Sequence, residues 1–458
     1  MKKNFRGRKC LVVGSGISGL GSAALLEQMG AEVVLYDSNE KLTAEEIRAK
    51  LPGDSRAVCV AGELAEEIYE TAQTVVLSPG VPVDIPLVTA LRERGAQIIG
   101  EIELGYQEEK GRVAAITGTN GKTTTTTLTG EIMRAHLGAD KVFVVGNIGD
   151  PYTSECLKTG EDTATVGEIS SFQLETIRDF HPAVSAILNI TPDHLNRHHT
   201  MKAYVRAKEA IAMNQTKSDV CVLNYDNCYT RSFGERCPAR VVWFSSASEL
   251  EEGYWLKGDK IVKSVSGREE ELLDIHRDMR LVGMCNVENV MAAMAIAEEM
   301  GVPMDTILSV VKGFRAVEHR IEFVATKAGV DYYNDSKGTN PDAAIQGIRA
   351  MSRPTVLIGG GYDKQSEYDD WIESFDGKVK WLVLIGQTRE KIAECAKRHG
   401  FDRIRFADTF DECLKLCTAL AEKGDAVLLS PACASWGMFP DYEVRGRLFK
   451  EYVTGLEG

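Results

Sequence analysis

Short apolar runs alternate with longer amphipathic stretches along the first hundred residues. The apolar runs are rich in valine, isoleucine and leucine, and the segments between them, such as residues 18–29, have helical spacing. Strands that alternate with helices form parallel sheets, because each crossover helix returns the chain to the same end of the sheet. We therefore predict a parallel, doubly wound sheet with strands at residues 10–13, 32–36, 57–60, 74–77 and 97–99.

The same alternation resumes twice after charged or irregular segments. We interpret residues 107–112 and 312–319 as linkers. Between them we predict a helix at residues 286–300 and strands at residues 113–117, 142–145, 163–168, 184–189 and 220–224. Beyond the second linker we predict a helix at residues 388–399 and strands at residues 332–334, 355–358, 381–385 and 426–429.

The length of 458 residues exceeds what one ordinary core needs. At about 150 residues per domain it corresponds to three domains. Together with the linkers, this predicts an α/β protein with domains at residues 1–106, 107–314 and 315–458. The first and third resemble Rossmann-like sheets.

Charge and composition narrow the function classes. The formal net charge is −14, which disfavours a protein that binds nucleic acid through its phosphate backbone. The chain has neither an apolar run of membrane-spanning length nor a signal-peptide core, so we expect a cytoplasmic protein without membrane insertion. Its 11 cysteines include no CxxC pair and no His/Cys cluster, which indicates neither a zinc site nor a disulfide framework.

A first glycine motif follows the first predicted strand. Gly14, Gly16 and Gly19 have GxGxxG spacing, and Asp37 ends the next strand. Such glycines let a backbone approach a diphosphate at a helix N-terminus, while the acidic residue accepts a hydrogen bond from a ribose hydroxyl. Both NAD and UDP supply a diphosphate and a ribose. An NAD-dependent dehydrogenase is therefore one alternative at this stage, and close strand–helix packing without any ligand is another.

A second glycine loop lies between the strand at residues 113–117 and a helical run. Its sequence is TGTNGKTT, residues 117–124. In a P-loop, backbone amides surround phosphates, the lysine contacts the β and γ phosphates and the following hydroxyl faces Mg2+. Ile116 stands where the general pattern has glycine, so the pattern is partly met. We predict ATP binding in a central P-loop ATPase-type domain by Gly118, Thr119, Asn120, Gly121, Lys122, Thr123 and Thr124.

Further blocks follow the loop in a fixed order. They are GNIG (146–149), EISSFQLE (168–175), NITPDHL (189–195), EHR (318–320), NDSKGTN (334–340) and LSPACAS (429–435). The ordered set resembles the Mur ligase family over essentially the whole chain. The last two blocks are most similar to the branch of that family that adds D-glutamate.

The resemblance implies a fold and a reaction. In the family the three domains bind the UDP sugar, ATP, and the incoming amino acid together with ATP. The implied reaction is ATP-dependent ligation of D-glutamate to UDP-N-acetylmuramoyl-L-alanine through an acyl phosphate, in peptidoglycan precursor synthesis. It favours UDP over NAD at the first glycine motif. A sibling Mur ligase or a folylpolyglutamate-type ligase with another acceptor is the remaining alternative. We expect a monomer.

The resemblance also assigns the catalytic and metal-binding residues. Lys122 and Mg2+ would stabilise the transferring phosphoryl group, as electrostatics usually dominates such reactions. Glu168 ends a predicted strand and offers the hard oxygen that Mg2+ prefers. His194 matches a histidine that contacts a second Mg2+, and Thr123 a hydroxyl ligand. Lys208 lies in a predicted helix at residues 201–213 and has the pattern of a surface lysine, but it matches a lysine that CO2 carbamylates into a metal ligand.

The remaining assignments concern the substrates. For the UDP substrate the matched residues are Ser15, Ser18, Asp37, Ser78, Pro79, Gly80, Asn147, Ser170 and Gln173. For the nucleotide they include Asn286, Asn289, Arg320, Asp335 and Lys337. For D-glutamate they are Thr339, Lys364, Ser435 and Tyr442. The chain departs from the family at Cys285, where a histidine usually precedes the asparagine.

Overall fold

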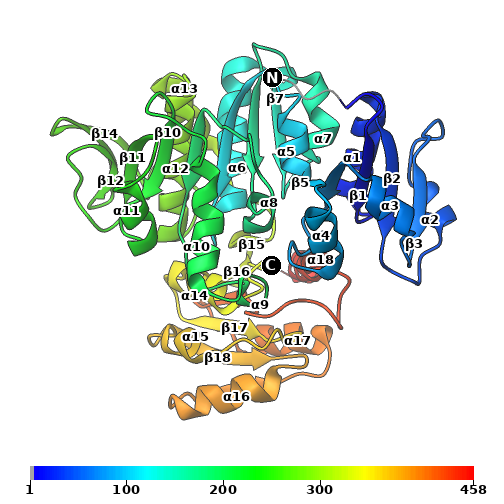
Figure 1. Ribbon diagram of the computed structural model, residues 1–458. Coiled ribbons are helices and arrows are strands. Elements are labelled where there is room, and N and C mark those ends of the chain that lie inside the picture. Colours follow the sequence, from blue (N-terminus) through cyan, green and yellow to red (C-terminus); the bar gives the residue numbers. More distant parts are fainter. Residues whose placement is uncertain (1–4, 458) are drawn as a thin grey trace. The chain divides into compact units, whose positions relative to one another are not determined.

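The computed structural model describes residues 5–457, apart from the side chain of Asn196. The chain forms two compact units. One consists of Met1–Leu273 and Asn289–Val311, and the other of Asp274–Glu288 and Lys312–Gly458. These units contain three β-sheets with helices between their strands (Figure 1). This α/β architecture confirms the predicted fold class.

The first sheet is entirely parallel and has the strand order β3-β2-β1-β4-β5. Its strands are β1 (Lys9–Val13), β2 (Glu32–Asp37), β3 (Val58–Ala61), β4 (Thr74–Leu77) and β5 (Gln97–Gly100). All five lie where the sequence predicts strands. The order reverses between β1 and β4, and open α/β sheets bind ligands beyond the carboxyl ends of the strands at such a point. The segments after Val13 and Leu77 are therefore placed for binding.

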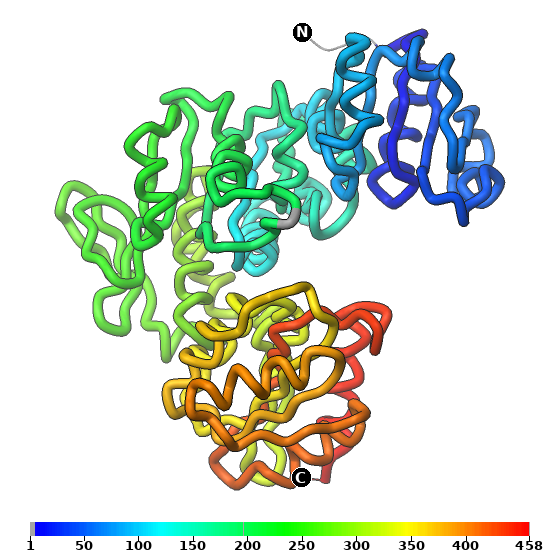
Figure 2. The backbone as a smooth tube through the Cα atoms, turned by 60° about the horizontal axis from the view of Figure 1, so that its bottom comes forward, coloured from blue at the N-terminus to red at the C-terminus, as the bar shows by residue number. Residues whose placement is uncertain are grey.

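Helices cover both faces of this sheet (Figure 2). They are α1 (Ile17–Gln28), α2 (Ala44–Arg48), α3 (Glu66–Thr71), α4 (Pro86–Glu93) and α5 (Glu101–Tyr106). Val12 and Val76 belong to the core that holds α1 and α5, whereas Leu11 and Val75 belong to the core that holds α4. Successive strand residues face opposite sides, and apolar residues at consecutive positions therefore fill both cores.

The second sheet has nine strands in the order β14-β13-β12-β11-β10-β9-β6-β8-β7. They are β6 (Arg112–Thr117), β7 (Val142–Gly146), β8 (Ala164–Glu168), β9 (Val184–Ile187), β10 (Val220–Asn224), β11 (Arg240–Ser245), β12 (Gly253–Lys257), β13 (Lys260–Val265) and β14 (Arg268–Asp274). The first five are predicted strands. The last four were missed, and β12 pairs with β13 in antiparallel fashion.

The helices of the middle region are α6 (Lys122–Leu137), α7 (Tyr152–Glu155), α8 (Ser171–Leu174), α9 (Leu195–His198), α10 (Met201–Glu209), α11 (Cys228–Gly234), α12 (Met284–Glu299) and α13 (Met304–Gly313), with 3-10 turns at Ala139–Lys141, Cys156–Lys158 and Ala210–Ala212. The predicted helix at residues 201–213 thus ends earlier. Within α12, residues Val290 to Ala297 are buried on every side, so this helix is part of a core.

The third sheet has the order β15-β16-β20-β17-β18-β19. Its strands are β15 (Glu322–Lys327), β16 (Val330–Asn334), β17 (Thr355–Gly359), β18 (Val379–Leu384), β19 (Ile404–Phe406) and β20 (Ala426–Leu429), and its helices are α14 (Pro341–Ala350), α15 (Asp369–Glu373), α16 (Arg389–Arg398), α17 (Phe410–Leu420) and α18 (Tyr442–Gly455). Only β15 is antiparallel to its neighbour. The carboxyl ends of β16, β20 and β17 therefore lie side by side.

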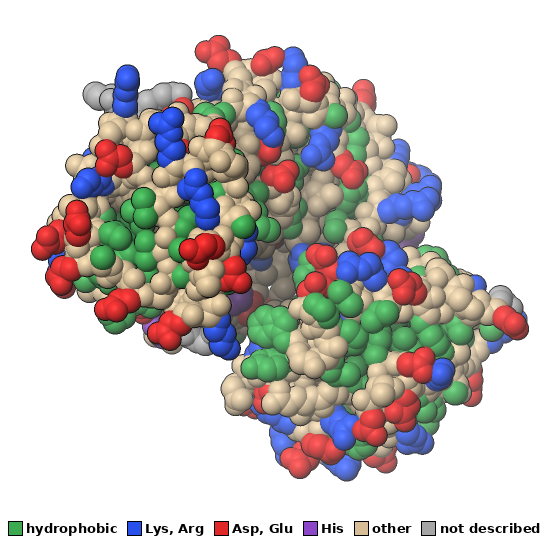
Figure 3. Space-filling view, turned by 90° about the vertical axis from the view of Figure 1, so that its right-hand side faces the viewer, with side chains coloured by type: hydrophobic (Ala, Val, Ile, Leu, Met, Phe, Trp, Pro, Cys, Tyr) green, Lys and Arg blue, Asp and Glu red, His purple; other side chains and the backbone are tan. Residues whose placement is uncertain are grey.

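Charged side chains and the length of the apolar helices are two further features of the fold. Lys and Arg side chains are interspersed with Asp and Glu over the face drawn in Figure 3. Among residues 5–457, no helix is both long enough and apolar enough to cross a membrane.

Candidate active site

The second glycine loop joins the buried strand β6 to helix α6. Gly118 and Gly121 have φ angles of 155° and 84°, which glycine adopts without strain. A Cβ atom at Gly121 would lie 2.1 Å from Oδ1 of Asn289, so only glycine fits there. The amides at the start of α6 thus surround an open turn, which is the arrangement that binds phosphate. Asn289, predicted to serve the nucleotide, lies directly against this loop.

The NITPDHL segment holds the loop in place through paired hydrogen bonds. The Asn120 amide donates to Oδ1 of Asn189 over 2.8 Å, and Nδ2 of Asn189 donates to the Asn120 carbonyl over 3.1 Å. The Thr191 amide donates to Oγ1 of Thr119 over 3.0 Å, and the Tyr204 hydroxyl lies 3.1 Å from the same oxygen. These contacts fix the loop before any ligand binds.

Two lysines converge on one carbonyl of the loop. Nζ of Lys122 donates to the Gly118 and Thr119 carbonyls, each over 2.9 Å, and Nζ of Lys208 donates to the Gly118 carbonyl over 2.7 Å. Lys208 is 2% exposed, which corrects the surface interpretation that its sequence pattern favours. Burial and then the charge of Lys122 lower the pKa of Lys208 well below its usual value, while Asp193 and Glu168 act in the opposite direction.

Glu168 ends β8 beside the loop, since β6 and β8 are paired with Ile116 opposite Glu168. Its side chain is almost fully buried. Oε1 accepts a hydrogen bond from Nδ2 of Asn147 over 2.8 Å, whereas Oε2 is buried and has no hydrogen-bond partner among the described residues. A buried carboxylate oxygen in this state has coordination capacity left for a cation.

His194 and His198 lie at the two ends of α9. His194 has a φ angle of 53°, its side chain is 46% exposed, and its ring lies 4.9 Å from that of Phe172. His198 is buried, with Nε2 2.9 Å from the Ser171 hydroxyl and Nδ1 3.2 Å from Oε1 of Glu175. Because a carboxylate only accepts, Nδ1 carries the proton and Nε2 accepts from Ser171. His198 thereby joins the EISSFQLE block to the segment that carries His194.

The first glycine motif forms a tight turn at the β1–β4 switch point. A Cβ atom at Gly19 would lie 1.8 Å from the Gly14 carbonyl oxygen, whereas one at Gly16 would meet no atom within 4 Å. Oδ2 of Asp37 accepts from the Ser15 amide over 2.9 Å and from the Ser15 hydroxyl over 2.6 Å. Burial raises the pKa of Asp37, but these bonds outweigh it and hold the pKa below its usual value. Asp37 therefore fixes the turn, and Ser78 donates to the Gly14 carbonyl over 3.3 Å.

Three sequence blocks meet at the carboxyl ends of β16 and β20 in the second unit. Arg445 of α18, which is 1% exposed, joins two of them. It donates to the Ser336 hydroxyl and carbonyl over 3.0 and 2.7 Å and to the Cys433 carbonyl over 3.3 Å. Asp335 accepts from the Ser430 hydroxyl over 2.6 Å and from the Ile321 amide over 3.2 Å. Nδ2 of Asn334 lies 2.9 Å from Nδ1 of His319, so the EHR, NDSKGTN and LSPACAS blocks are one hydrogen-bonded assembly.

The residues predicted for D-glutamate surround this assembly. Ser435 is buried, and Tyr442 begins α18 with its ring under Nζ of Lys337 at 5.0 Å. Nζ of Lys364 lies 5.2 Å from the ring of Trp436, which in turn packs edge-on against Tyr362. Among the described residues, no carboxylate pairs with Lys364. Its charge is available for an anionic ligand.

The departure at residue 285 has a packing role. Cys285 packs against a hydrophobic cluster that includes Ala350, and burial raises the pKa of its thiol to about 12. The thiol is therefore neutral. The neighbouring Asn286 donates to the Val282 carbonyl over 2.8 Å.

Comparisons with known proteins match three successive parts of the chain to family models. Residues 8–100 match the N-terminal domain of MurD-like Mur ligases, residues 116–297 match the Mur ligase middle domain, and residues 319–433 match the Mur ligase glutamate ligase domain. The chain belongs to the Mur ligase family. Its relatives include UDP-N-acetylmuramoylalanine–D-glutamate ligases from Lachnoclostridium phytofermentans (56% identity), Lachnospira eligens (54%) and Clostridioides difficile (41%), each aligned over 99% of this chain and at least 99% of the relative.

Solved Mur ligase structures share the fold at low sequence identity. MurC from Thermotoga maritima has a TM-score of 0.60 at 18% identity, with 98% of this chain and 99% of that chain covered. MurF from Thermotoga maritima in complex with ADP has a TM-score of 0.59 at 16% identity, covering 99% and 97%. These similarities support the Mur ligase fold.

The family blocks contain most of the residues described above, and the structure adds residues that the blocks do not single out. Lys122, Glu168 and Lys208 gather around the second glycine loop, and Asn147 binds Glu168 directly. His198, Arg445 and Trp436 were missed. Histidine, arginine and tryptophan in otherwise unremarked positions carry no local signal, because their partners lie far away in the sequence.

Proposed function

We propose that this Mur ligase joins D-glutamate to UDP-N-acetylmuramoyl-L-alanine, with cleavage of ATP to ADP and phosphate, in peptidoglycan precursor synthesis. The observation that carries the proposal is the identity of 41–56% to ligases of that name over practically the whole length of both chains. The dehydrogenase alternative has no comparable support. A sibling ligase with another acceptor is the alternative that an experiment must exclude.

The proposal assigns a role to each predicted domain. Residues 1–106 bind the UDP substrate, residues 107–314 bind ATP, and residues 315–458 bind D-glutamate. The glycine turn at the β1–β4 switch point supports the first assignment, because backbone amides at a helix start bind diphosphate well. The loop around Lys122 supports the second. The charge of Lys364, which lies over the ring of Trp436, the residue after the buried Ser435, supports the third.

The residues around the second glycine loop fit Mg2+. Oε2 of Glu168 is buried without a hydrogen-bond partner among the described residues, which is the state expected of a carboxylate awaiting a cation. Mg2+ prefers such hard oxygen donors. Glu168 and the Thr123 hydroxyl would hold one ion, and His194 with a carbamylated Lys208 a second. Bound Mg2+ neutralises charge on the phosphates.

The surroundings of Lys208 support its carbamylation. The side chain is buried, and among residues 5–457 only the Gly118 carbonyl accepts a hydrogen bond from its ammonium group. A buried cation beside a second cation, Lys122, is unfavourable. Reaction of the neutral amine with CO2 forms an N–C bond and releases a proton, which turns the side chain into an anion. The carbamate then offers two oxygens and compensates the charge of Lys122.

In the proposed reaction, an oxygen of the substrate carboxylate takes the γ-phosphoryl group, and ADP leaves. Lys122 stabilises the negative charge that develops on the transferring group. The D-glutamate amine then attacks the acyl carbon, forms the amide bond and loses a proton, and phosphate leaves with the carboxylate oxygen. Lys364, Ser435, Thr339 and Tyr442 orient the amino acid. The assigned contacts of Arg320, Asp335 and Lys337 with the nucleotide stay predictions.

The experiment is a screen of phosphate release with UDP-N-acetylmuramoyl-L-alanine and a panel of amino acids. We expect release with D-glutamate and little with L-glutamate or with L-lysine. Lys122→Ala should abolish release while the UDP substrate still binds, because Lys122 acts on the phosphoryl group. A preference for another amino acid would assign the chain to a sibling activity, and near-normal release by Lys122→Ala would refute the role of the loop.

A further inference from the structure

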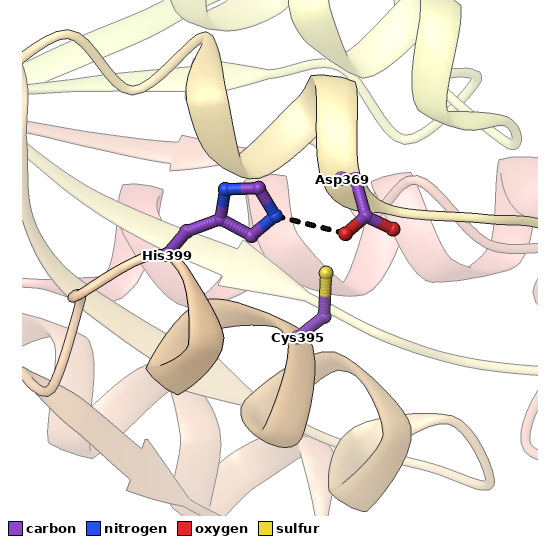
Figure 4. A group of neighbouring side chains, drawn as sticks. All are labelled: Asp369, Cys395 and His399. Atoms are coloured by element: carbon purple, nitrogen blue, oxygen red, sulfur yellow. Dashed lines mark hydrogen bonds and ion pairs between the residues drawn. The ribbon is translucent and has the colours of Figure 1, made fainter.

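Three metal-binding side chains lie together in the second unit, on α15, on α16 and directly after α16. They are Asp369, Cys395 and His399, whose ligand atoms all lie within 4.8 Å of one another. Cys395 and His399 are four residues apart, so one helical turn places them on the same face of α16. Asp369 begins α15. Figure 4 shows the sulfur and the imidazole pointing toward the Asp369 carboxylate.

The exposed fraction of the side chain increases from Cys395 to His399 to Asp369. Cys395 is 3% exposed, whereas the side chains of His399 and Asp369 are 24% and 42% exposed. The thiol thus forms the floor of the cluster, and the carboxylate and imidazole form its solvent side. Nε2 of His399 lies 2.8 Å from Oδ1 of Asp369, so the two groups hold each other without a metal. A cation has access from solvent.

A second carboxylate addresses the other nitrogen of the same imidazole. Oε1 of Glu373, one turn after Asp369 on α15, lies 3.5 Å from Nδ1 of His399. A histidine that binds a metal through Nε2 usually donates its Nδ1 proton to a carboxylate, which fixes the ring and its tautomer. Glu373 is placed for that role. This contact is independent of the three ligand atoms themselves.

We propose that Asp369, Cys395 and His399 bind one Zn2+ ion. Zn2+ accepts the combination of thiolate sulfur, imidazole nitrogen and carboxylate oxygen, and its tetrahedral geometry leaves one position for water. The site is distinct from the Mg2+ donors around Glu168, which contain no sulfur. It does not depend on the proposed ligase activity.

Metal binding displaces the proton of the thiol. Burial, and after it the charge of Asp369, raise the pKa of the free Cys395 thiol to about 11. The thiol is therefore protonated before binding, and Zn2+ must release that proton. The affinity rises with pH as a result. Arg398, whose NH2 lies 3.3 Å from Oδ1 of Asp369, must yield this oxygen or share it.

The site lies beside the segment that carries Lys364. Residues 360–368 join β17 to α15, and Asp369 follows them directly. Lys391 of α16 donates to the Ser366 carbonyl over 2.8 Å and so already ties this segment to the helix. Bound Zn2+ would add a second tie between α16 and the end of the segment. We infer that it rigidifies the backbone around Lys364 and raises the melting temperature.

Cobalt substitution tests the proposal in the full-length protein. Co2+ added to the metal-free protein should give a thiolate-to-cobalt charge-transfer band that saturates at one thiolate-bound ion per chain, and Zn2+ should abolish the band by displacing Co2+. The band should be lost in Cys395→Ser and in His399→Gln and weakened in Asp369→Asn. The matched control is Cys228→Ser, which removes an exposed cysteine outside the cluster and should retain the band.

Two results of this experiment would overturn the Zn2+ proposal. No charge-transfer band in the wild-type protein at stoichiometric Co2+ would overturn the proposal, and so would a band that persists in Cys395→Ser. If Cys395→Ser does not fold, His399→Gln decides, because its partly exposed side chain can be replaced without opening the core. Ligase activity of any of these proteins has no bearing on the result.

Discussion

At the scale of single residues, burial excludes the surface interpretation of Lys208, and its carbamylation stays a prediction. Its sequence surroundings are those of a surface lysine, but its ammonium group lies at the floor of the phosphate loop. We expect Lys208→Ala to lower turnover by about a hundredfold or more, since it removes an anion and a metal contact. Added formate or acetate should restore part of the rate by filling the vacated space, and neutral formamide should not.

Lys202 supplies the matched control, because it lies on the same helix and is exposed. Lys202→Ala should leave phosphate release unchanged. Wild-type turnover by Lys208→Ala in CO2-equilibrated buffer would defeat the carbamate assignment while leaving Lys122 and Glu168 in their roles.

Trp436 is a second residue whose role appears only in the structure. Its ring lies under Nζ of Lys364, and we expect this contact to position the ammonium group for the carboxylate of D-glutamate. A cation–π contact at a partly exposed position is worth about 0.5–1 kcal/mol, so Trp436→Ala should raise KM for D-glutamate about two- to fivefold. KM for the UDP substrate should not change, and Trp436→Phe should restore most of the loss. An equal rise in both KM values would contradict this positioning role.

Asp335 links residue chemistry to the pH dependence of stability. Burial raises the pKa of its carboxyl to about 7, despite hydrogen bonds from Ser430 and Ile321 and the charges of Arg320 and Arg445. The folded protein therefore keeps this carboxyl protonated at pH values above the ordinary carboxyl pKa of about 4. The unfolded chain loses the proton first, so the contribution to stability is present at low pH and lost as pH rises toward about 7.

Asp335→Asn should flatten this part of the pH profile, because the amide keeps an acceptor for Ile321 and has no charge. Urea unfolding at about pH 5 and about pH 7 measures the effect in both proteins. An identical difference between the two pH values in wild type and variant would show that another group carries the dependence.

At the scale of elements, two glycines of the first motif differ in their surroundings, and we expect Gly19 to serve packing and Gly16 to serve binding. Gly19→Ala would place a Cβ atom 1.8 Å from the Gly14 carbonyl oxygen, which the backbone must move to accommodate. We expect a loss of about 1–3 kcal/mol in the free energy of unfolding. Gly16 begins the same helix in an extended conformation with free space around it.

Gly16→Ala is therefore the control within the same motif. Its stability should stay within about 1 kcal/mol of wild type, whereas UDP binding should weaken because the new methyl group stands between the backbone and the diphosphate. Thermal unfolding and UDP titration of both variants test the pair. Equal destabilisation by both substitutions would contradict the assignment.

The elements themselves differ in how well their sequences predict them. The strands β1, β4 and β20 are short apolar runs buried on both faces, so their hydrophobicity alone marks them. Hydrophobicity alone does not identify the strands β11 to β14. The central residues of β11 are only partly buried, and β14 begins with exposed charged residues, REEE. Tertiary pairing stabilises such strands, and a single sequence contains little trace of it.

At the scale of the whole molecule, the ordered family blocks indicated which segments lie together better than local chemistry did. Parallel strands bring their carboxyl ends to one edge, so blocks that follow β6, β8 and β9 had to converge. The sequence could not show the hydrogen bonds that hold these blocks together. Arg445 reaches Ser336 and Cys433 across more than one strand, and His198 reaches Ser171. Such pairings follow from the fold and not from spacing.

The proposed ligase reaction rests on one chemical claim, that phosphorylation activates the carboxylate of the UDP substrate. Labelling both carboxylate oxygens of UDP-N-acetylmuramoyl-L-alanine with oxygen-18 tests this claim directly. An acyl phosphate transfers one of these oxygens to phosphate when the amine of D-glutamate displaces it. Mass spectrometry should therefore find one labelled oxygen in each released phosphate, and one labelled oxygen left in the new amide. Unlabelled phosphate, formed while the amide product accumulates, would contradict the account.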